Sequence, residues 1–255
     1  MKTKTLERWS PFILLLAILL LWQVFVVLFS IPDFIFPSPW QIATQFTEFS
    51  GPLLEAAWKT FWVTMLGFAL AIVVGVLLGF LVGSSRAAYA ALYPLLVGFN
   101  AVPKAAVVPI LVVWFGIGLG PGILTAFLIS FFPITVNIAT GLATLEPELE
   151  DVLRVLGAKR WDVLVKVGLP RSMPYFYGSL KVAITLAFVG TTVSEMTAAN
   201  EGIGYLLISA GSAMQMGLAF AGLLVVGAMA MAMYELFSFI EKRTTGWAHR
   251  GSQGT

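Results

Sequence analysis

The chain has 255 residues, of which 59% are hydrophobic and 11% are charged, and its mean hydropathy is +0.92. Soluble domains carry about 25% charged residues, so this composition excludes a soluble globular protein and indicates a membrane protein. The net charge of +2 gives no argument for nucleic acid, and the absence of cysteine excludes disulfides, thiolate metal sites and a cysteine nucleophile.

Six apolar runs are long enough to cross a bilayer, which takes about 20 helical residues. The third run is interrupted by Pro94, Pro103, Lys104 and Pro109, so we expect a kinked or discontinuous span. The first run exceeds the apolar core of about 7 to 15 residues in a cleaved signal, and we expect it to remain as a span. The expected spans are 12–29, 60–82, 89–115, 123–142, 176–196 and 218–240.

The positive charges indicate the orientation of these spans. If the N-terminus is cytoplasmic, the inner segments hold almost all Lys and Arg residues, as the positive-inside rule requires. The outer loops hold Asp33, Glu48, Glu55, Lys59 and Glu201. The sequence therefore predicts an all-α, polytopic membrane helix bundle with both termini cytoplasmic: a segment 1–11, one transmembrane domain 12–240, and a disordered tail 241–255. The inner cations are Lys2, Lys4, Arg8, Arg86, Arg154, Lys159, Arg160, Lys166, Arg171, Lys242, Arg243 and Arg250.

The largest inner loop, 144–175, carries a helical pattern. Apolar residues at 149, 152, 153 and 156 share one helix face, and Gly157 is expected to end that helix. A second short helix follows, with an Asp162 to Lys166 pair on its surface, and Pro170 is expected to end it. One interpretation of this loop is an amphipathic segment lying flat on the bilayer.

The spacing within the loop favours another interpretation. Asp151-Val152-Leu153 is followed after three residues by Gly157, and after nine more by Val167-Gly168-Leu169-Pro170. This pattern resembles the cytoplasmic EAA loop of ATP-binding cassette (ABC) importer permeases, in which Glu-Ala-Ala, Gly and Leu-Pro have the same spacing. Asp replaces Glu and Val-Leu replaces Ala-Ala, which makes the first helical turn bulkier. Below, residues 144–175 are called the coupling loop.

The resemblance covers roughly 61–247. The stretches VPKAAVVPILVVWFGIG (102–118) and SEMTAANEGIGYLL (194–207) look like the nitrate, sulfonate and taurine branch of these permeases, which also serves thiamine-precursor and riboflavin-type substrates. The resemblance implies two permease chains, with the second expected to be identical, and two ATPase chains that hold ATP and Mg. It also implies a periplasmic or lipid-anchored substrate-binding protein and the bacterial inner membrane, with no cofactor on this chain and no nucleic acid.

A pump needs an energy source, yet the chain has no G-x-x-x-x-G-K-[ST] phosphate loop, so we expect ATP hydrolysis on a separate chain. In this interpretation apolar residues of the coupling loop anchor in the ATPase and basic residues pair with charges around them. The anchors would be Leu153, Leu156 and Trp161, and the basic residues Arg154, Lys159 and Arg160. The pattern residues Asp151, Gly157, Leu169 and Pro170 complete the candidate coupling site.

Small residues predict close helix packing. Gly75, Gly79 and Gly83 form two successive G-x-x-x-G steps on the second span. They would contact either another helix of the same chain or the second chain.

Polar groups inside the spans are candidates for a substrate pathway. Lys104, directly after Pro103, would either attract an anionic substrate or bond carbonyl groups freed by the kink. Lys181 is expected to reach the cytoplasmic interface. The remaining candidates, near the outer end of the fifth span, would line the pathway or form hydrogen bonds between helices: Thr191, Thr192, Ser194 and Glu195.

No metal cluster, catalytic triad or carboxylate pair emerges from the sequence, so we expect a transport subunit rather than an enzyme. A channel or secondary transporter would share the six spans, with Lys104 and Glu195 as its coupling groups. A structural membrane scaffold would not need the coupling-loop pattern. Neither alternative explains that pattern.

Overall fold

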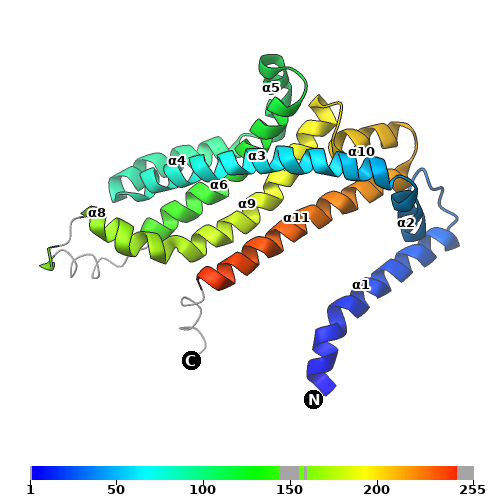
Figure 1. Ribbon diagram of the computed structural model, residues 1–255, viewed down its shortest axis with the longest axis horizontal. Helices are drawn as coiled ribbons and strands as arrows, with labels where there is room; N and C mark the ends of the chain where they lie inside the picture. The colour runs from blue at the N-terminus through cyan, green and yellow to red at the C-terminus, as the bar shows by residue number, and fades with distance from the viewer. Residues whose placement is uncertain (1, 144–154, 158–159, 246–255) are drawn as a thin grey trace.

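The computed structural model describes residues 2–143, 155–157 and 160–245. In these ranges the regular structure is helical (Figure 1). The elements, in chain order, are α1 (Lys2–Leu28), α2 (Pro39–Glu48), α3 (Ser50–Gly83), α4 (Arg86–Ala101), the 3₁₀-helix η1 (Lys104–Val107), α5 (Val108–Phe115), α6 (Leu119–Ala143), α8 (Arg160–Val163), the π-helix η2 (Leu164–Gly168), α9 (Leu169–Ala198), α10 (Ile203–Ser212) and α11 (Met216–Thr244).

The predicted all-α membrane bundle is confirmed. Among the described residues, five helices are long and apolar enough to span a membrane, and a bent pair gives a sixth span. The pair joins α4 to η1 and α5 at an angle of 72°, which agrees with the discontinuity expected around Pro103. Two short helices, α2 and α10, were not predicted because each is shorter than a membrane span.

Several helices are longer than the apolar runs that identified them. α1 begins at Lys2 rather than near 12, α3 at Ser50 rather than near 60, and α9 at Leu169 rather than near 176. Hydropathy finds the part of a helix that lies in hydrocarbon, whereas the hydrogen-bonded helix continues through polar residues such as Glu55 and Lys59.

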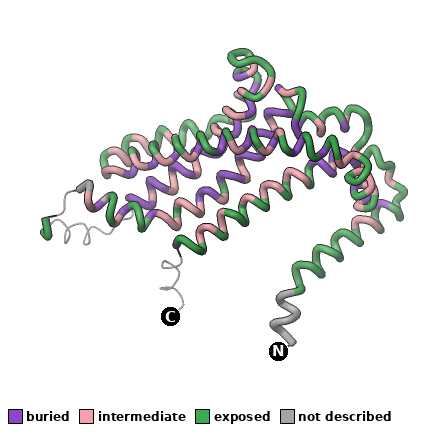
Figure 2. Tube along the Cα trace, in the orientation of Figure 1, coloured by how far each residue is buried: buried purple, intermediate pink, exposed green. Residues whose placement is uncertain are grey.

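The core consists of α3, α6 and α9, which lie side by side (Figure 1) and carry most of the buried positions (Figure 2). Gly75, Gly79 and Gly83 all face α6 of the same chain. A Cβ atom at Gly79 would lie 2.8 Å from the Ile138 Cβ and from the Thr135 carbonyl oxygen. The contact within the chain is therefore the one that the structure contains, and it brings the two backbones close together.

A second apolar cluster lies at the end of the bundle where α2 and α10 are found. It joins α2 and the start of α3 to α10 and the start of α11, with Leu53 and Ile203 almost fully buried. By contrast, α1 stands away from the bundle (Figure 1), and only 6% of its most apolar window is buried. α4 has no buried residue. Both helices present apolar side chains to whatever surrounds this chain.

The close approach of α3 and α6 predicts a difference between two chemically identical substitutions. Gly79→Ala places a methyl group against backbone of α6, whereas Gly98→Ala on α4 meets nothing within 4 Å. Overpacking costs about 1–3 kcal/mol, while Ala in an open helical position is favoured by up to about 1 kcal/mol. Thermal unfolding in detergent should show a lower midpoint for Gly79→Ala and an equal or higher midpoint for Gly98→Ala. Equal midpoints for both variants would contradict the packing.

Candidate functional site

The described part of the coupling loop has a turn at Gly157, where the first helix was predicted to end; residues 144–154 of that helix lie outside the described residues. Gly157 has φ +87°, a left-handed conformation that glycine adopts without the steric cost of a side chain. Just before it, Val155 and Leu156 are 88% and 76% exposed, although both are apolar. Asp151, Leu153, Arg154 and Lys159 lie outside the described residues. Arg160 and Trp161 lie in α8, and the Asp162–Lys166 ion pair is confirmed at 3.0 Å.

The prediction that Pro170 ends the second helix is wrong. α8, η2 and α9 follow one another without a break from Arg160 to Ala198, and Leu169 and Pro170 open α9. Proline is tolerated in the first turn of a helix, and the π-helix η2 immediately before it changes the hydrogen-bond register there. The described end of the coupling loop is thus continuous with a helix that extends to Ala198.

The bend at Pro103 is stabilised by Lys104. Its ammonium group donates hydrogen bonds to the Asn100 carbonyl oxygen and to Asn100 Oδ1, the latter at 2.6 Å. In an uninterrupted helix the amide of residue 104 would bond that carbonyl, so the side chain replaces a backbone donor that the bend removes. This geometry is the carbonyl-bonding alternative for Lys104.

The buried carboxylate of Glu195 connects three helices. Its side chain, on α9, is 5% exposed and accepts a hydrogen bond from the Thr60 hydroxyl of α3 at 2.9 Å. It also accepts one from the Gly204 amide of α10 at 2.9 Å, and the Ile203 amide donates to the Thr60 oxygen at 2.8 Å. Glu195 and Thr60 therefore occupy the first-turn amide groups of α10, where a negative charge is favoured.

Glycine residues make room for this carboxylate. A side chain at Gly202, which has φ +94°, or at Gly204 would collide with Glu195. The spacing Glu-x₆-Gly-x-Gly from 195 to 204 is the sequence signal that could have shown the contact. Sequence reasoning identified Glu195 but missed Thr60, because a single threonine at the start of an apolar run carries no pattern of its own.

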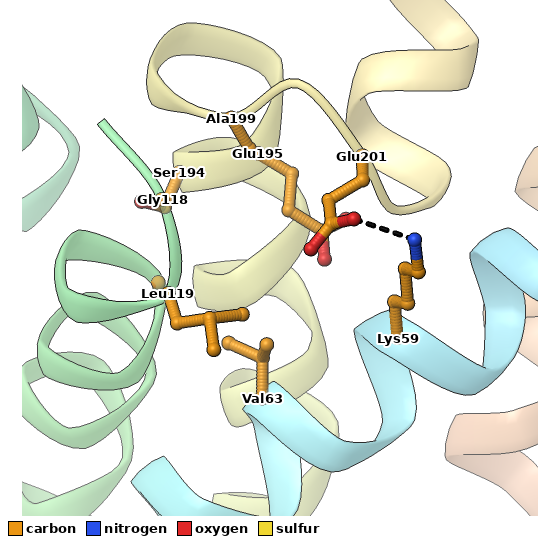
Figure 3. A pocket seen from close by; sticks show the side chains of 9 residues that line it. Lys59, Val63, Gly118, Leu119, Ser194, Glu195, Ala199 and Glu201 are labelled. Atoms are coloured by element: carbon orange, nitrogen blue, oxygen red, sulfur yellow. Dashed lines mark hydrogen bonds and ion pairs between the residues drawn. The ribbon is translucent and has the colours of Figure 1, made fainter.

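The cavity beside Glu195 is small. Lys59 and Glu201, bonded at 2.5 Å, both line it (Figure 3). The other lining residues are Val63, Gly118, Leu119, Gly122, Ser194 and Ala199. Its volume is about 20 Å³, which is room for one water molecule. A solute of several heavy atoms does not fit there in this conformation.

The other polar candidates on α9 are also buried between helices. The Thr64 hydroxyl donates to that of Thr191 at 2.8 Å, and Thr192 bonds the Phe188 carbonyl oxygen at 2.9 Å. Ser194 is 1% exposed. Thr191 thus forms a hydrogen bond between helices, which was the second of the two alternatives, whereas the bond of Thr192 stays within α9.

Lys181 forms an ion pair that the sequence analysis did not predict. Its Nζ lies 2.7 Å from Glu241 Oε2 on α11. The sequence assigned Glu241 to the solvated end of the last span, and nothing in hydropathy relates two residues 60 positions apart.

The sequence comparison with known families identifies this bundle. The family described as "binding-protein-dependent transport system inner membrane component" matches residues 71–246. The chain belongs to this family. It is a membrane-spanning ABC importer permease subunit, which decides against the channel, secondary-transporter and scaffold interpretations.

Individual relatives agree with this assignment. A probable ABC transporter permease protein of Haemophilus influenzae is 34% identical over 230 residues, covering 88% of this chain and 92% of that protein. The formylaminopyrimidine transport permease protein ThiX of Halalkalibacterium halodurans is 32% identical (79% and 81% covered), and the riboflavin transport system permease protein RibX of Chloroflexus aurantiacus is also 32% identical (91% and 88%).

A solved structure shares the fold of the permease. A chain of the MetNI methionine ABC transporter in an inward-facing conformation superposes with a TM-score of 0.68 at 17% identity. The match covers 77% of this chain and 98% of that one. At this identity the likeness concerns the fold.

The hydrogen bonds of Thr60 predict a local loss of stability. Thr60→Val keeps the shape of the side chain but removes a donor from Glu195 and the acceptor of the Ile203 amide. An unsatisfied buried polar group costs about 1–3 kcal/mol. The control is Thr185→Val on α9, whose hydroxyl is exposed and bonds only the Val182 carbonyl oxygen of its own helix. Denaturant unfolding in detergent should show a lower free energy of unfolding for Thr60→Val and no change for Thr185→Val. Equal free energies of unfolding for the two variants would contradict the role of Thr60.

Proposed function

We propose that two copies of this permease form the solute pathway of an importer, and that separate ATPase chains drive it through the coupling loop. Exposed Val155 and Leu156, directly before the turn at Gly157, support this proposal because an apolar pair in water is expected to be covered by a partner. The continuous helical run from α8 to α9 carries the proposal, since it provides a mechanical link from that partner to the membrane.

The proposed transmission is a rigid-body movement. From Arg160 to Ala198 the helical run is roughly 55 Å long at about 1.5 Å per residue. Closure of the ATPases would displace its inner end, and the covalent helix would carry the displacement to Glu195 and the outer end. The hydrogen bonds of Glu195 to α3 and α10 would then pass the movement on to those helices. The pathway would thereby open alternately to the two sides of the membrane.

The proposed topology places both termini in the cytoplasm of a bacterium whose inner membrane holds the chain. The structure gathers α2, α10 and the loops with Asp33, Glu48 and Glu201 at one end of the bundle (Figure 1). Lys166, at the start of the α8 to α9 run, lies toward the opposite end, together with the C-terminal turn of α11 and its Lys242 and Arg243. This separation follows the positive-inside rule. A periplasmic or lipid-anchored binding protein would deliver the solute to the acidic end.

The proposed substrate is a small heterocyclic vitamin precursor, with a sulfonate, taurine or nitrate-like anion as the alternative. Relatives named for formylaminopyrimidine and riboflavin are each 32% identical to this chain, and a putative aliphatic sulfonates permease of Bacillus subtilis is 28% identical. The cations inside the described spans favour the neutral solute. Lys59, Lys104 and Lys181 each bond a group of this chain already, which reduces their attraction for an anion.

The coupling proposal is tested by copurification. Affinity purification of the tagged permease should recover an ATPase chain, and Leu156→Glu should reduce both the recovery and ATP-driven uptake in vesicles by about tenfold, since it places a charge in an apolar contact. Leu156→Met is the matched control because it keeps the position apolar. Wild-type recovery and uptake with Leu156→Glu would contradict docking at this residue.

The substrate proposal needs the whole transporter. Vesicles that contain the permease, its ATPase and its binding protein should take up a labelled pyrimidine or flavin precursor when ATP is supplied. A fivefold excess of unlabelled taurine or nitrate should leave this uptake unchanged. Competition by those anions, without uptake of any heterocycle, would favour the anion branch instead.

A further inference from the structure

An ion pair joins α9 to α11 where α11 ends. The Lys181 ammonium lies 2.7 Å from Glu241 Oε2, and the two side chains are 18% and 13% exposed. Lys181 also lies 5.8 Å from the centre of the Tyr234 ring, two turns earlier on α11. α9 therefore contacts two positions of α11 through a single cation, which fixes the register of the two helices.

The burial of α11 differs between its two ends. Its buried residues, Gly217, Leu218, Ala219, Ala221 and Gly222, all lie in its first two turns, against α10 and α2. From Leu223 to Thr244 no residue of the helix is buried, and Leu224 and Met231 are 60% and 67% exposed. The outer end of α11 is thus the more tightly packed part, and along its inner part exposed and half-buried residues alternate (Figure 2).

The inner part of α11 contacts the core only through half-buried apolar side chains among the described residues: Val226, Met229, Ala230, Met233 and Phe237. Phe237 packs edge-on against Phe68 of α3, with ring centroids 5.5 Å apart. In a bilayer, however, lipid tails are as apolar as these side chains, so the hydrophobic effect gives little preference for helix contact over lipid. A half-buried ion pair is specific by contrast, because separating its partners in lipid leaves each charge without compensation.

The location of the pair connects it to the coupling loop. α9 continues inward past the end of α11 (Figure 1), through η2 and α8. Lys181 therefore lies between the coupling loop and the outer hydrogen bonds of Glu195 on one helical run. A displacement of the coupling loop reaches Lys181 before it reaches Glu195.

We propose that the Lys181–Glu241 ion pair ties the inner end of α11 to α9, so that α11 pivots about its packed outer end and follows the movement of the coupling loop. The two residues are positioning residues, and the role in transport rests on the proposed function. The tie itself does not depend on that function, because it is a property of the isolated chain.

The first test measures the tie by hydrogen exchange of the purified full chain in lipid nanodiscs. Glu241→Gln should accelerate exchange in 223–244 by about fivefold or more and leave 216–222 unchanged, because local opening follows the loss of local contacts. Glu235→Gln, on the same helix at an exposed position, is the matched control and should change neither region. Unchanged exchange in 223–244, or faster exchange throughout the chain, would overturn the tie.

Glu241→Gln also leaves the charge of Lys181 unpaired, and two double variants distinguish that effect from loss of the tie. Lys181→Met with Glu241→Leu removes both charges and should still show the faster exchange in 223–244, since apolar side chains do not replace the pair in lipid. Lys181→Glu with Glu241→Lys restores an ion pair with exchanged signs and should bring exchange back to within about twofold of wild type. Wild-type exchange in the apolar variant, or no recovery in the exchanged one, would overturn the proposal.

The second test uses the assembled transporter with its ATPase and binding protein. The apolar double variant should lower solute uptake per ATP hydrolysed by about fivefold, and the charge-exchanged variant should restore it. Wild-type uptake per ATP in the apolar variant would overturn the role in transport while leaving the tie measured by exchange. If the wild-type transporter shows no ATP-driven uptake, the proposed function fails and the exchange result stands by itself.

Discussion

Hydrocarbon does not hydrogen-bond, so each polar group of the bundle must find its partner within the protein, and this constraint shapes the helix contacts of the permease. Glu195 is surrounded by the Thr60 hydroxyl and the Gly204 amide, and Lys104 bonds the carbonyl group left by the bend. Each polar group satisfied in this way fixes the relative position of two elements. The bundle is therefore held by a few directional bonds together with close backbone packing between α3 and α6.

α9 carries more of these bonds than its apolar sequence suggests. It starts in the coupling loop and pairs with α11 through Lys181. Near its other end, Glu195 is hydrogen-bonded to α3 and α10. Such an arrangement suits a subunit that must transmit movement, because a stiff helix with fixed attachments loses little displacement along its length. The cavity beside Glu195, about 20 Å³, is too small for a solute. Opening a pathway at this end would therefore require the attached helices to move.

Hydropathy and charge distribution were sufficient to predict the all-α membrane bundle, its spans and the bend at Pro103, because a bilayer imposes a length and a polarity on each helix. The prediction that Pro170 ends the second short helix of the coupling loop was wrong, since a single sequence does not distinguish a proline that opens a helix from one that closes it. The partners of Lys181 and Glu195 were also missed. Contacts between residues 60 and 135 positions apart depend on how the helices pack, and a single sequence contains no direct record of that.

The rigidity of α9 is the central claim, and it is open to direct measurement because the native chain has no cysteine. Spin labels at Val165→Cys and Val189→Cys, both at exposed positions, would lie roughly 36 Å apart along a continuous helix. Pulsed electron paramagnetic resonance on the assembled transporter would measure this distance without nucleotide and with trapped ATP. The labelled permease would be diluted with unlabelled copies, so that each transporter carries one labelled chain. The account predicts one narrow distribution that is the same in both states. A second, shorter distance in the ATP state would mean that the helix bends, and would contradict transmission by a rigid α9.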